Sequence, residues 1–492
     1  MNETQKEYYK MERLIKIGQV KRKNSREVKE SPIGIGFEKL DRDVFDPEKA
    51  YDKVAAIGVK WVRIQSGWAR TEKEKGVYDF AWLDAIVENL LRRNLRPWIC
   101  LCYGNELYSN FAKTYFGAVG CPPIATPEER EGWANYVRAV VSRYRGKVEY
   151  YEIWNEPDAR YSWKHALQDG ETEPGPNAVE YAQFAMLTAD AIHEANPDAK
   201  AIGFGVSHGY DFTYINTALA QGLADHIDAL SFHAYTPDDT RRAEYLRSYR
   251  LLLDSYRPGI EIIQGETGAQ SRSDGSGAMA GYSWTPEKQR KHLLRNQLHD
   301  LAGGVKFTSY FSTMDMIEAL RGIVGEVSTY LDYGYFGVLG ADFDENGRSV
   351  GTYTPKPSYY ALATMASIFA EGCRAEPILA RRVVLPAKRI HGKDCNDPSI
   401  VTYSFTKENG SKALVYWNAV PLLTHTYEGT VSFQTFGNIG KDAKLIDLAD
   451  GSVYKLPEQM VTDAGCGEID FVNLPITDSP LMLTFGDFCE TE

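Results

Sequence analysis

A regular alternation of two patterns runs through most of this chain and limits the folds open to it. Short apolar runs of strand length alternate with longer segments whose apolar residues recur at helical spacing. Successive parallel strands need helical crossovers, and eight such units over about 340 residues are typical of a (β/α)8 barrel. We therefore predict a TIM barrel over residues 31–370. The predicted strands are Ile33–Phe37, Trp61–Gln65, Pro97–Tyr103, Val148–Trp154, Ala201–Val206, Ala229–Tyr235, Ile260–Gly265 and Val305–Phe311.

The pattern changes after residue 370. Four runs alternate apolar and polar residues, and turn-rich stretches separate them. This alternation is typical of antiparallel strands with one solvated face, so it predicts a C-terminal β-sandwich domain over residues 371–492. Residues 1–30 form an N-terminal extension, which we expect to add a strand to that module. The predicted fold class is α/β, a TIM barrel with a C-terminal antiparallel β-sandwich. The four runs are residues 399–406, 412–420, 429–436 and 468–474.

The overall charge argues against a phosphate-rich partner. The chain has 55 Lys and Arg against 67 Asp and Glu, a net charge of −12, and a sequence pI near 5.4. Nucleic-acid binders neutralise phosphates with clustered Lys and Arg, whereas the one basic stretch here, residues 16–26, is short and interrupted. We expect no nucleic-acid partner. A carbohydrate partner is compatible with the aromatic content of 12%, although most of these rings must serve the core.

The sequence also bears on location and on metal binding. It contains no run of about 18 apolar residues, so no membrane span is expected. The N-terminal stretch has no apolar h-region, which predicts a cytoplasmic protein as the chain stands, or a secreted or periplasmic one if a leader has been removed. The seven cysteines show no CxxC spacing, so we expect neither a disulfide framework nor a zinc site.

Two predicted strands end in glutamate. Function in a TIM barrel sits at the C-terminal ends of the strands. The fourth strand reads KVEYYEIWNEPD and ends at Asn155-Glu156, and the seventh reads GIEIIQGETG and ends at Glu266. Strands three places apart in a ring of eight can face each other across the mouth. Two carboxylates in one mouth indicate acid/base chemistry.

Other acidic residues are rivals of this pair. Glu152 lies some 13 Å below Glu156 at a rise of ~3.3 Å per residue, so it belongs to the barrel floor or wall. Glu261 is low on the seventh strand by the same argument. Asp158 and Asp315 lie near the mouth, where we expect substrate contact or loop structure rather than catalysis.

The motif EIWNEPD, together with a glutamate ending strand seven 110 residues later, resembles the retaining glycoside hydrolases of clan A. The resemblance covers the whole barrel, and the added β-module is most similar to family 39, the β-xylosidase-type branch, or a nearby branch. It implies that Glu156 is the general acid/base and Glu266 the nucleophile. Glycoside cleavage needs one carboxyl kept protonated and one kept ionised, which agrees with these two roles.

The resemblance also implies roles for residues around the pair. Asn155 would bind the sugar 2-hydroxyl, and Arg63 would hold Glu266 ionised. Tyr235, at the end of strand six, would hydrogen-bond the nucleophile, with His233 pointing the same way. Each has a structural alternative: Arg63 could form an ion pair inside the barrel, and His233 could be a hydrogen-bonded wall residue.

Four aromatic residues that follow strands are candidate sugar platforms. Clan A relatives often carry a tryptophan at the end of strand eight, whereas this chain reads VKFTSYFSTMD there. Tyr310 or Phe311 could take its place, which leaves the identity of the bound sugar open. Aromatic side chains also prop loops, which is the alternative for each candidate. The substrate-binding candidates are Trp68, Tyr103, Trp284 and Tyr310.

These observations predict a retaining β-glycosidase that acts by double displacement on β-linked glycosides, oligosaccharides or polysaccharides, without a cofactor or metal. The alternative is a barrel that binds carbohydrate without cleaving it, and retention of both glutamates argues against it. A metal- or nicotinamide-dependent barrel would need an HExxH, a His/Asp cluster or a GxGxxG motif, which the chain lacks. The sugar, the choice of endo or exo action and the oligomeric state stay open.

Overall fold

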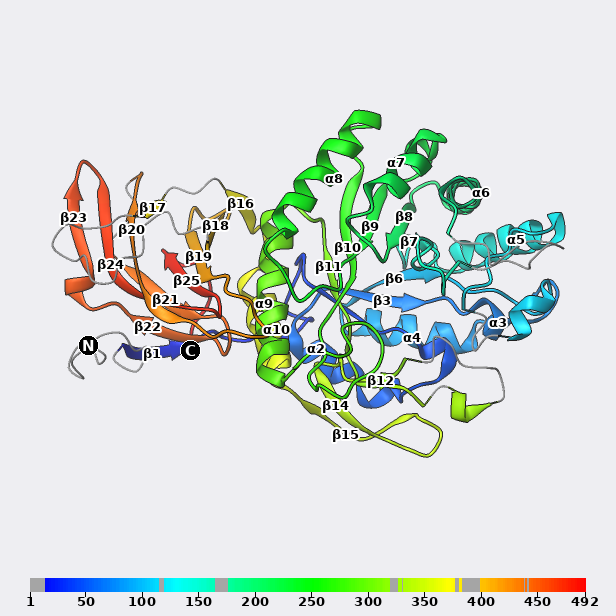
Figure 1. The fold of residues 1–492 in the computed structure, drawn as a ribbon, viewed down its shortest axis with the longest axis horizontal. Helices are drawn as coiled ribbons and strands as arrows, with labels where there is room; N and C mark the ends of the chain where they lie inside the picture. The colour runs from blue at the N-terminus through cyan, green and yellow to red at the C-terminus, as the bar shows by residue number, and fades with distance from the viewer. Residues whose placement is uncertain are drawn as a thin grey trace.

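A computed structural model describes residues 14–114, 119–163, 176–318, 326–329, 331–376, 380–382, 399–437, 439 and 442–492. Eight parallel strands close into a barrel in the order β2-β3-β6-β7-β8-β9-β10-β11, with β11 paired to β2 (Figure 1). The predicted fold class is confirmed, and each barrel strand overlaps its predicted range. The barrel strands are β2 (Gly34–Gly36), β3 (Trp61–Gln65), β6 (Arg96–Leu101), β7 (Tyr150–Ile153), β8 (Lys200–Val206), β9 (Ala229–His233), β10 (Glu261–Thr267) and β11 (Thr308–Tyr310).

Helices separate consecutive strands and form the outer layer of the barrel. Thr126 and Thr285 cap α5 and α9 through their side chains, and proline occupies the first turn of each helix. The main helices are α2 (Tyr51–Ile57), α4 (Ala81–Arg92), α5 (Pro127–Arg143), α6 (Ala178–Ala195), α7 (Phe212–Ala220), α8 (Arg242–Tyr256), α9 (Pro286–Ala302) and α10 (Pro357–Ile368). A short helix α3 (Trp68–Thr71) and the hairpin β4 (Glu72–Glu74) and β5 (Val77–Tyr78) follow β3.

The interior of the barrel changes from apolar to charged along its axis. A layer of large apolar side chains fills the end where the strands begin, with the rings of Trp61 and Phe307 stacked at 4.3 Å. Above this layer the inward-facing side chains are polar, and Arg63 and Glu152 are both fully buried. The apolar layer therefore closes the floor, so that chemistry is confined to the mouth. It consists of Trp61, Trp98, Tyr150, Ile202, Ala229, Ile263 and Phe307.

Two antiparallel sheets form the C-terminal module, with the strand orders β1-β22-β21-β25-β19-β18-β16 and β17-β20-β24-β23. Side chains from both sheets share one apolar cluster, which includes Tyr416, Phe433 and Phe471. The N-terminal strand β1 (Ile15–Gln19) pairs with β22, as Figure 1 shows. The other strands are β16 (Arg374–Glu376), β17 (Ala380–Arg382), β18 (Ile400–Thr406), β19 (Lys412–Asn418), β20 (Glu428–Thr435), β21 (Ala443–Asp447), β22 (Ser452–Lys455), β23 (Val461–Gly465), β24 (Glu468–Thr477) and β25 (Leu481–Phe485).

Helix α9 joins the barrel to this module. Its buried Arg295 donates hydrogen bonds to the carbonyl oxygens of Asn418 and Asp478, and Lys291 pairs with the Asp478 carboxylate at 2.6 Å. Within the described ranges, no helix is long and apolar enough to cross a membrane. None of the described cysteines forms a disulfide bond. Short strands line the region after β11: β12 (Met316–Ile317), β13 (Tyr333–Gly334), β14 (Leu339–Phe343) and β15 (Ser349–Pro355).

Candidate active site

A cavity of about 640 Å³ opens at the C-terminal ends of the barrel strands. Segments that follow β2, β7, β8, β9, β10 and β11 contribute to its wall, which includes both Glu156 and Glu266. The loop after β10 closes one side through Gly277, Ala278 and Met279. The cavity has the size of a small-molecule site and the position expected for one in a TIM barrel.

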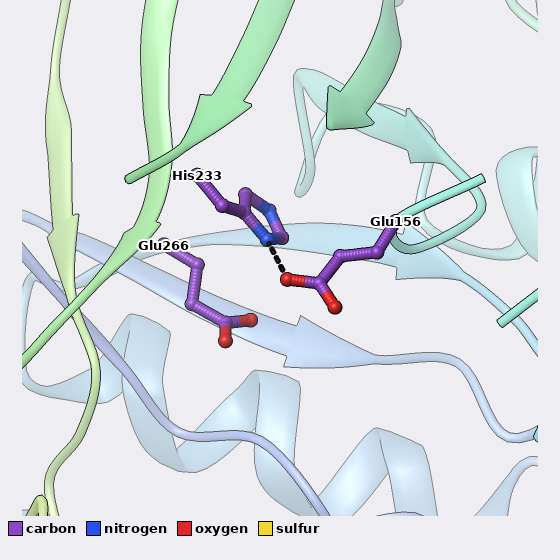
Figure 2. A group of neighbouring side chains, drawn as sticks. All are labelled: Glu156, His233 and Glu266. Carbon is purple, nitrogen blue, oxygen red and sulfur yellow. Dashed lines mark hydrogen bonds and ion pairs between the residues drawn. The ribbon is translucent and has the colours of Figure 1, made fainter. Parts of the chain in front are cut away.

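The carboxyl groups of Glu156 and Glu266 approach each other from opposite sides of this mouth (Figure 2). One oxygen of each group, together with one nitrogen of His233, lies within 4.8 Å of the other two atoms. Glu156 is buried and Glu266 is partly exposed to the cavity. The two predicted strand ends are therefore brought together.

Irregular backbone aims both glutamates into the mouth. Trp154 and Glu156 adopt left-handed conformations, with φ of 66° and 50°, directly beyond β7. The Glu156 N–H donates to the Gly205 carbonyl at 3.0 Å, which fixes this turn against the neighbouring strand. In β10 the pairing with β9 shifts between Gln264 and Glu266. Such strain and such bulges re-aim side chains next to active sites.

Glu266 accepts two strong hydrogen bonds. The Arg63 guanidinium donates to Oε2 at 2.7 Å, and the Tyr235 hydroxyl donates to Oε1 at 2.5 Å. Together the two donors fix the orientation of the Glu266 carboxyl group at the mouth of the barrel. The contacts are those that the resemblance implied for Arg63 and Tyr235.

Arg63 is the centre of a buried charge network. Its guanidinium also contacts Glu152 Oε2 at 2.5 Å, Asn155 Oδ1 at 2.8 Å and Glu38 Oε1 at 3.5 Å. Burial alone would raise the pKa of Glu152, but Arg63 and His233 outweigh it and lower that pKa to about 2. Glu152 is thus a fixed anion in the barrel wall, and it holds the guanidinium beneath Glu266.

His233 bridges the two sides of the site. Its Nδ1 lies 2.9 Å from Glu156 Oε1, and its Nε2 lies 4.0 Å from Glu152 Oε1. Burial would lower the pKa of His233, but Glu266, Glu152 and Glu156 raise it to about 10. A protonated imidazole donates from both ring nitrogens, so His233 is placed to donate a hydrogen bond to Glu156. The expectation that no metal takes part stays a prediction.

The chain is similar in sequence to known glycoside hydrolases. Residues 47–249 match the family model of Glycosyl hydrolases family 39. The part of the barrel from before α2 into α8 therefore resembles the glycosyl hydrolases of family 39. The predicted resemblance to a glycoside hydrolase of clan A is thereby confirmed. Two curated relatives are β-xylosidases, one from Geobacillus stearothermophilus with 27% identity over 172 residues and one from Caldicellulosiruptor saccharolyticus with 28% identity over 199 residues.

These sequence matches cover 33% and 37% of this chain, and 31% and 38% of the two relatives. The chain therefore spans about a third of the length of the curated relatives it matches. Solved structures resemble it over most of its length. A family 39 glycoside hydrolase from Bacteroides cellulosilyticus matches 95% of this chain and 83% of its own, with a TM-score of 0.64 and 18% identity. A monomeric β-xylosidase from Caulobacter crescentus covers 95% and 97%, with a TM-score of 0.57 and 16% identity.

Three of the four candidate sugar platforms do not line the cavity. Trp68 is fully buried, donates to Glu72, and packs against Tyr108 and Trp133 behind the strands. Trp284 is 3% exposed and donates to the Met279 carbonyl, so it supports the loop after β10. These side chains are loop and core residues in this structure, which corrects the expectation of a substrate contact.

Of the remaining aromatic candidates, Tyr103 lines the cavity and Tyr310 does not. Tyr103 lines the cavity, and its hydroxyl accepts a hydrogen bond from Gln65 at 3.0 Å. Tyr310 is fully buried and does not line it, because adjacent residues of an extended segment point to opposite sides. Phe311 lines the cavity instead, and its ring lies 5.3 Å from that of Phe336. Of these two residues, Phe311 is the one in the cavity wall, and its role as a sugar platform stays a prediction.

The rival acids have structural partners. Asp158 accepts hydrogen bonds from the backbone N–H groups of Ser207 and His208, so it orders the loop after β8. Asp315 pairs with Lys356 at 2.6 Å. Glu261 is the first residue of β10, far from the mouth, and pairs with Lys200 at 3.3 Å.

Sequence reasoning missed a group of charged residues in the cavity wall. Glu38 and Lys39 follow β2, and Glu318 follows β12; all three are buried, and Lys39 pairs with Glu318 at 3.4 Å. The signal that could have found Glu38 is its position, two residues beyond the end of β2. Tyr161, which donates a hydrogen bond to Glu156 Oε2, was also missed.

Replacing Glu38 by glutamine is expected to reduce the loss of stability that occurs as the pH rises from about 4.5 to about 8. Burial raises the pKa of Glu38 to about 8, from 4.5, although Arg63 opposes the rise. The folded protein keeps a proton that the unfolded chain releases, so this contribution to stability is lost as the pH rises from about 4.5 through about 8. Over this pH range, the free energy of unfolding of the variant should fall by roughly 2 to 4 kcal/mol less than that of the wild type. Urea unfolding at a series of pH values measures it.

The raised pKa of His233 also makes the folded protein less stable as the pH rises, in the wild type and in Glu38→Gln alike. The difference in unfolding free energy between the two proteins therefore reports on Glu38 alone. Glu128→Gln, at an exposed carboxyl on α5, serves as the control and should follow the wild type. Identical stability profiles for Glu38→Gln and the wild type would show that Glu38 is ionised in the folded protein at neutral pH.

Proposed function

We propose that the chain is a retaining β-glycosidase with Glu156 as acid/base and Glu266 as nucleophile. The observation that carries this proposal is the approach of their carboxyl oxygens to within 4.8 Å. Retaining glycosidases hold the two carboxyls ~5 to 5.5 Å apart, whereas inverting enzymes leave ~6.5 to 9.5 Å for a water molecule. A barrel that only binds carbohydrate has no need to hold two carboxyls this close.

In the first step, Glu266 forms a covalent bond to the anomeric carbon. The ionised carboxylate, held by Arg63 and Tyr235, attacks that carbon while the bond to the leaving oxygen breaks. Glu156 gives its proton to the leaving oxygen, which departs as an alcohol or a sugar hydroxyl. Asn155 accepts from Arg63 through Oδ1, so its amide N–H groups are the donors available to the sugar 2-hydroxyl.

In the second step, water releases the sugar. Glu156, now a carboxylate, takes a proton from the water as its oxygen attacks the anomeric carbon. The ester bond to Glu266 breaks, and both glutamates return to their starting protonation states. His233 donates toward Glu156 Oε1 at 2.9 Å, so it is placed to stabilise the carboxylate form of Glu156 between the two steps.

The substrates we propose are β-xylosides. The support is the description of the matched relatives as β-xylosidases, together with a cavity of about 640 Å³ that suits a short glycoside. The test is hydrolysis of a panel of aryl β-glycosides and β-linked oligosaccharides. Release from the β-xyloside above the other sugars is the expected result. Faster release from a hexoside or a uronide would contradict the xyloside assignment, and binding of many sugars without turnover would favour the carbohydrate-binding alternative.

A further inference from the structure

The wall of the cavity has two unlike ends. One end is charged, with buried Glu38, Lys39 and Glu318 in its wall. The other end is walled by aromatic residues from the segment after β8 and from α8, and it reaches solvent at Tyr210, which is 59% exposed. An exposed aromatic ring that is continuous with a catalytic cavity is typical of a binding surface.

Two tyrosines and a histidine form this open end. The rings of Tyr210 and Tyr245 lie 6.1 Å apart at 35°, and the ring of His208 lies 6.0 Å from Tyr210, nearly perpendicular to it. The Arg241 guanidinium lies 5.1 Å over the Tyr245 ring and steadies it. The two tyrosines come from different elements, so their approach is a product of the fold.

His208 supplies a polar group at the same place. Its Nδ1 lies 2.8 Å from the Ser207 hydroxyl and 3.3 Å from Asp158, which orients the ring. The hydrogen bond to Asp158 raises the pKa of His208. With Nδ1 engaged, Nε2 is the ring nitrogen available to donate to a ligand hydroxyl.

The position of this end relative to the carboxylates identifies its ligand. Glu156 follows β7, and Ser207 to Tyr210 follow β8, which is the next strand in the barrel. Glu266 lies two strands beyond β8, at the end of β10, where it pairs with His233 of β9. The group that departs with a proton from Glu156 therefore leaves along the aromatic wall, toward solvent.

We propose that Tyr210, Tyr245 and His208 form a subsite for the leaving-group sugar, a neutral pyranose ring β-linked to the sugar held at the carboxylate pair. This inference rests on the proposed function. A β-linked pyranose carries its axial C–H groups on its two faces, and these pack on the electron-rich face of an aromatic ring. Its hydroxyls lie at the edge, where His208 can donate.

The test compares two substrates that share the same xylosyl group. β-Xylobiose places a second ring in the subsite, whereas β-xylosyl fluoride leaves it empty. For Tyr210→Ala we expect a loss of kcat/KM of about tenfold on xylobiose and no more than about twofold on the fluoride. Tyr245→Ala should show the same selectivity. Tyr256→Ala is the control, because Tyr256 is an exposed tyrosine on α8 that does not line the cavity.

The outcomes separate the subsite from the proposed function. Equal losses on both substrates, or no loss on either, would overturn the subsite while leaving a working glycosidase. A wild type that hydrolyses neither substrate would contradict the proposed function and the subsite with it. Circular dichroism of the variants should match the wild type, since Tyr210 is exposed.

Discussion

Glu266→Ala is expected to lower kcat on aryl β-xylosides by roughly 10⁴-fold or more, the scale seen when an enzyme loses its nucleophile. The variant has no carboxylate to form the covalent intermediate, while Arg63 and Tyr235 lose their shared acceptor. The cavity keeps its shape, so KM should change far less than kcat. Initial-rate kinetics on a β-xyloside with an activated leaving group measures both.

Azide gives this variant a substitute nucleophile. Because azide would occupy the space vacated by the carboxylate, rescue should yield the α-glycosyl azide from a β-glycoside in a single inverting displacement. Glu261→Ala is the matched control, since Glu261 lies on the same strand at the floor of the barrel and pairs with Lys200 and Lys306. A Glu266→Ala variant that keeps substantial activity without azide would exclude Glu266 as nucleophile.

Glu156→Ala is expected to separate substrates by leaving group. Loss of general acid catalysis should cost about 10² to 10⁴-fold on xylobiose, whose leaving oxygen needs a proton. A dinitrophenyl β-xyloside needs no proton at that oxygen, so its first step should be nearly unaffected. Its second step should slow, because no base activates water, and a burst of dinitrophenol should precede slow turnover.

Azide should accelerate that slow second step and give the β-glycosyl azide, the opposite anomer from Glu266→Ala. Glu149→Ala is the control, at an exposed acid just before β7. Equal losses on both leaving groups would argue that Glu156 supports the site without donating the proton. The contrast between the two azide products assigns one role to each glutamate.

The alternation of patterns was sufficient to predict the barrel and its strand ends. Glu156 and Glu266 could be predicted to lie at the same barrel mouth, because the C-terminal ends of all barrel strands lie at one face. This holds for any conformation of the loops. The contacts of Arg63 and Tyr235 with Glu266 were expected only from the resemblance to clan A. The structure shows both contacts. The limits of the two main domains, and the assignment of residues 1–30 to the β-module, remain predictions.

The aromatic platforms could not be predicted in the same way. Trp68 and Trp284 follow strands, yet their rings turn into packing layers that only the tertiary structure defines. Glu38 escaped notice because a charged residue after a three-residue strand carries no local signal of burial. Tyr210 and Tyr245 meet only through the packing of α8 beside the segment after β8.

The stereochemistry of hydrolysis tests the central claim most directly. Proton NMR of a β-xyloside digest, recorded before mutarotation, shows which anomer of the sugar forms first. A double displacement through Glu266 predicts β-xylose as the first product, with net retention. α-Xylose as the first product would show a single displacement by water, and it would contradict the assignment of Glu156 and Glu266 as a retaining pair.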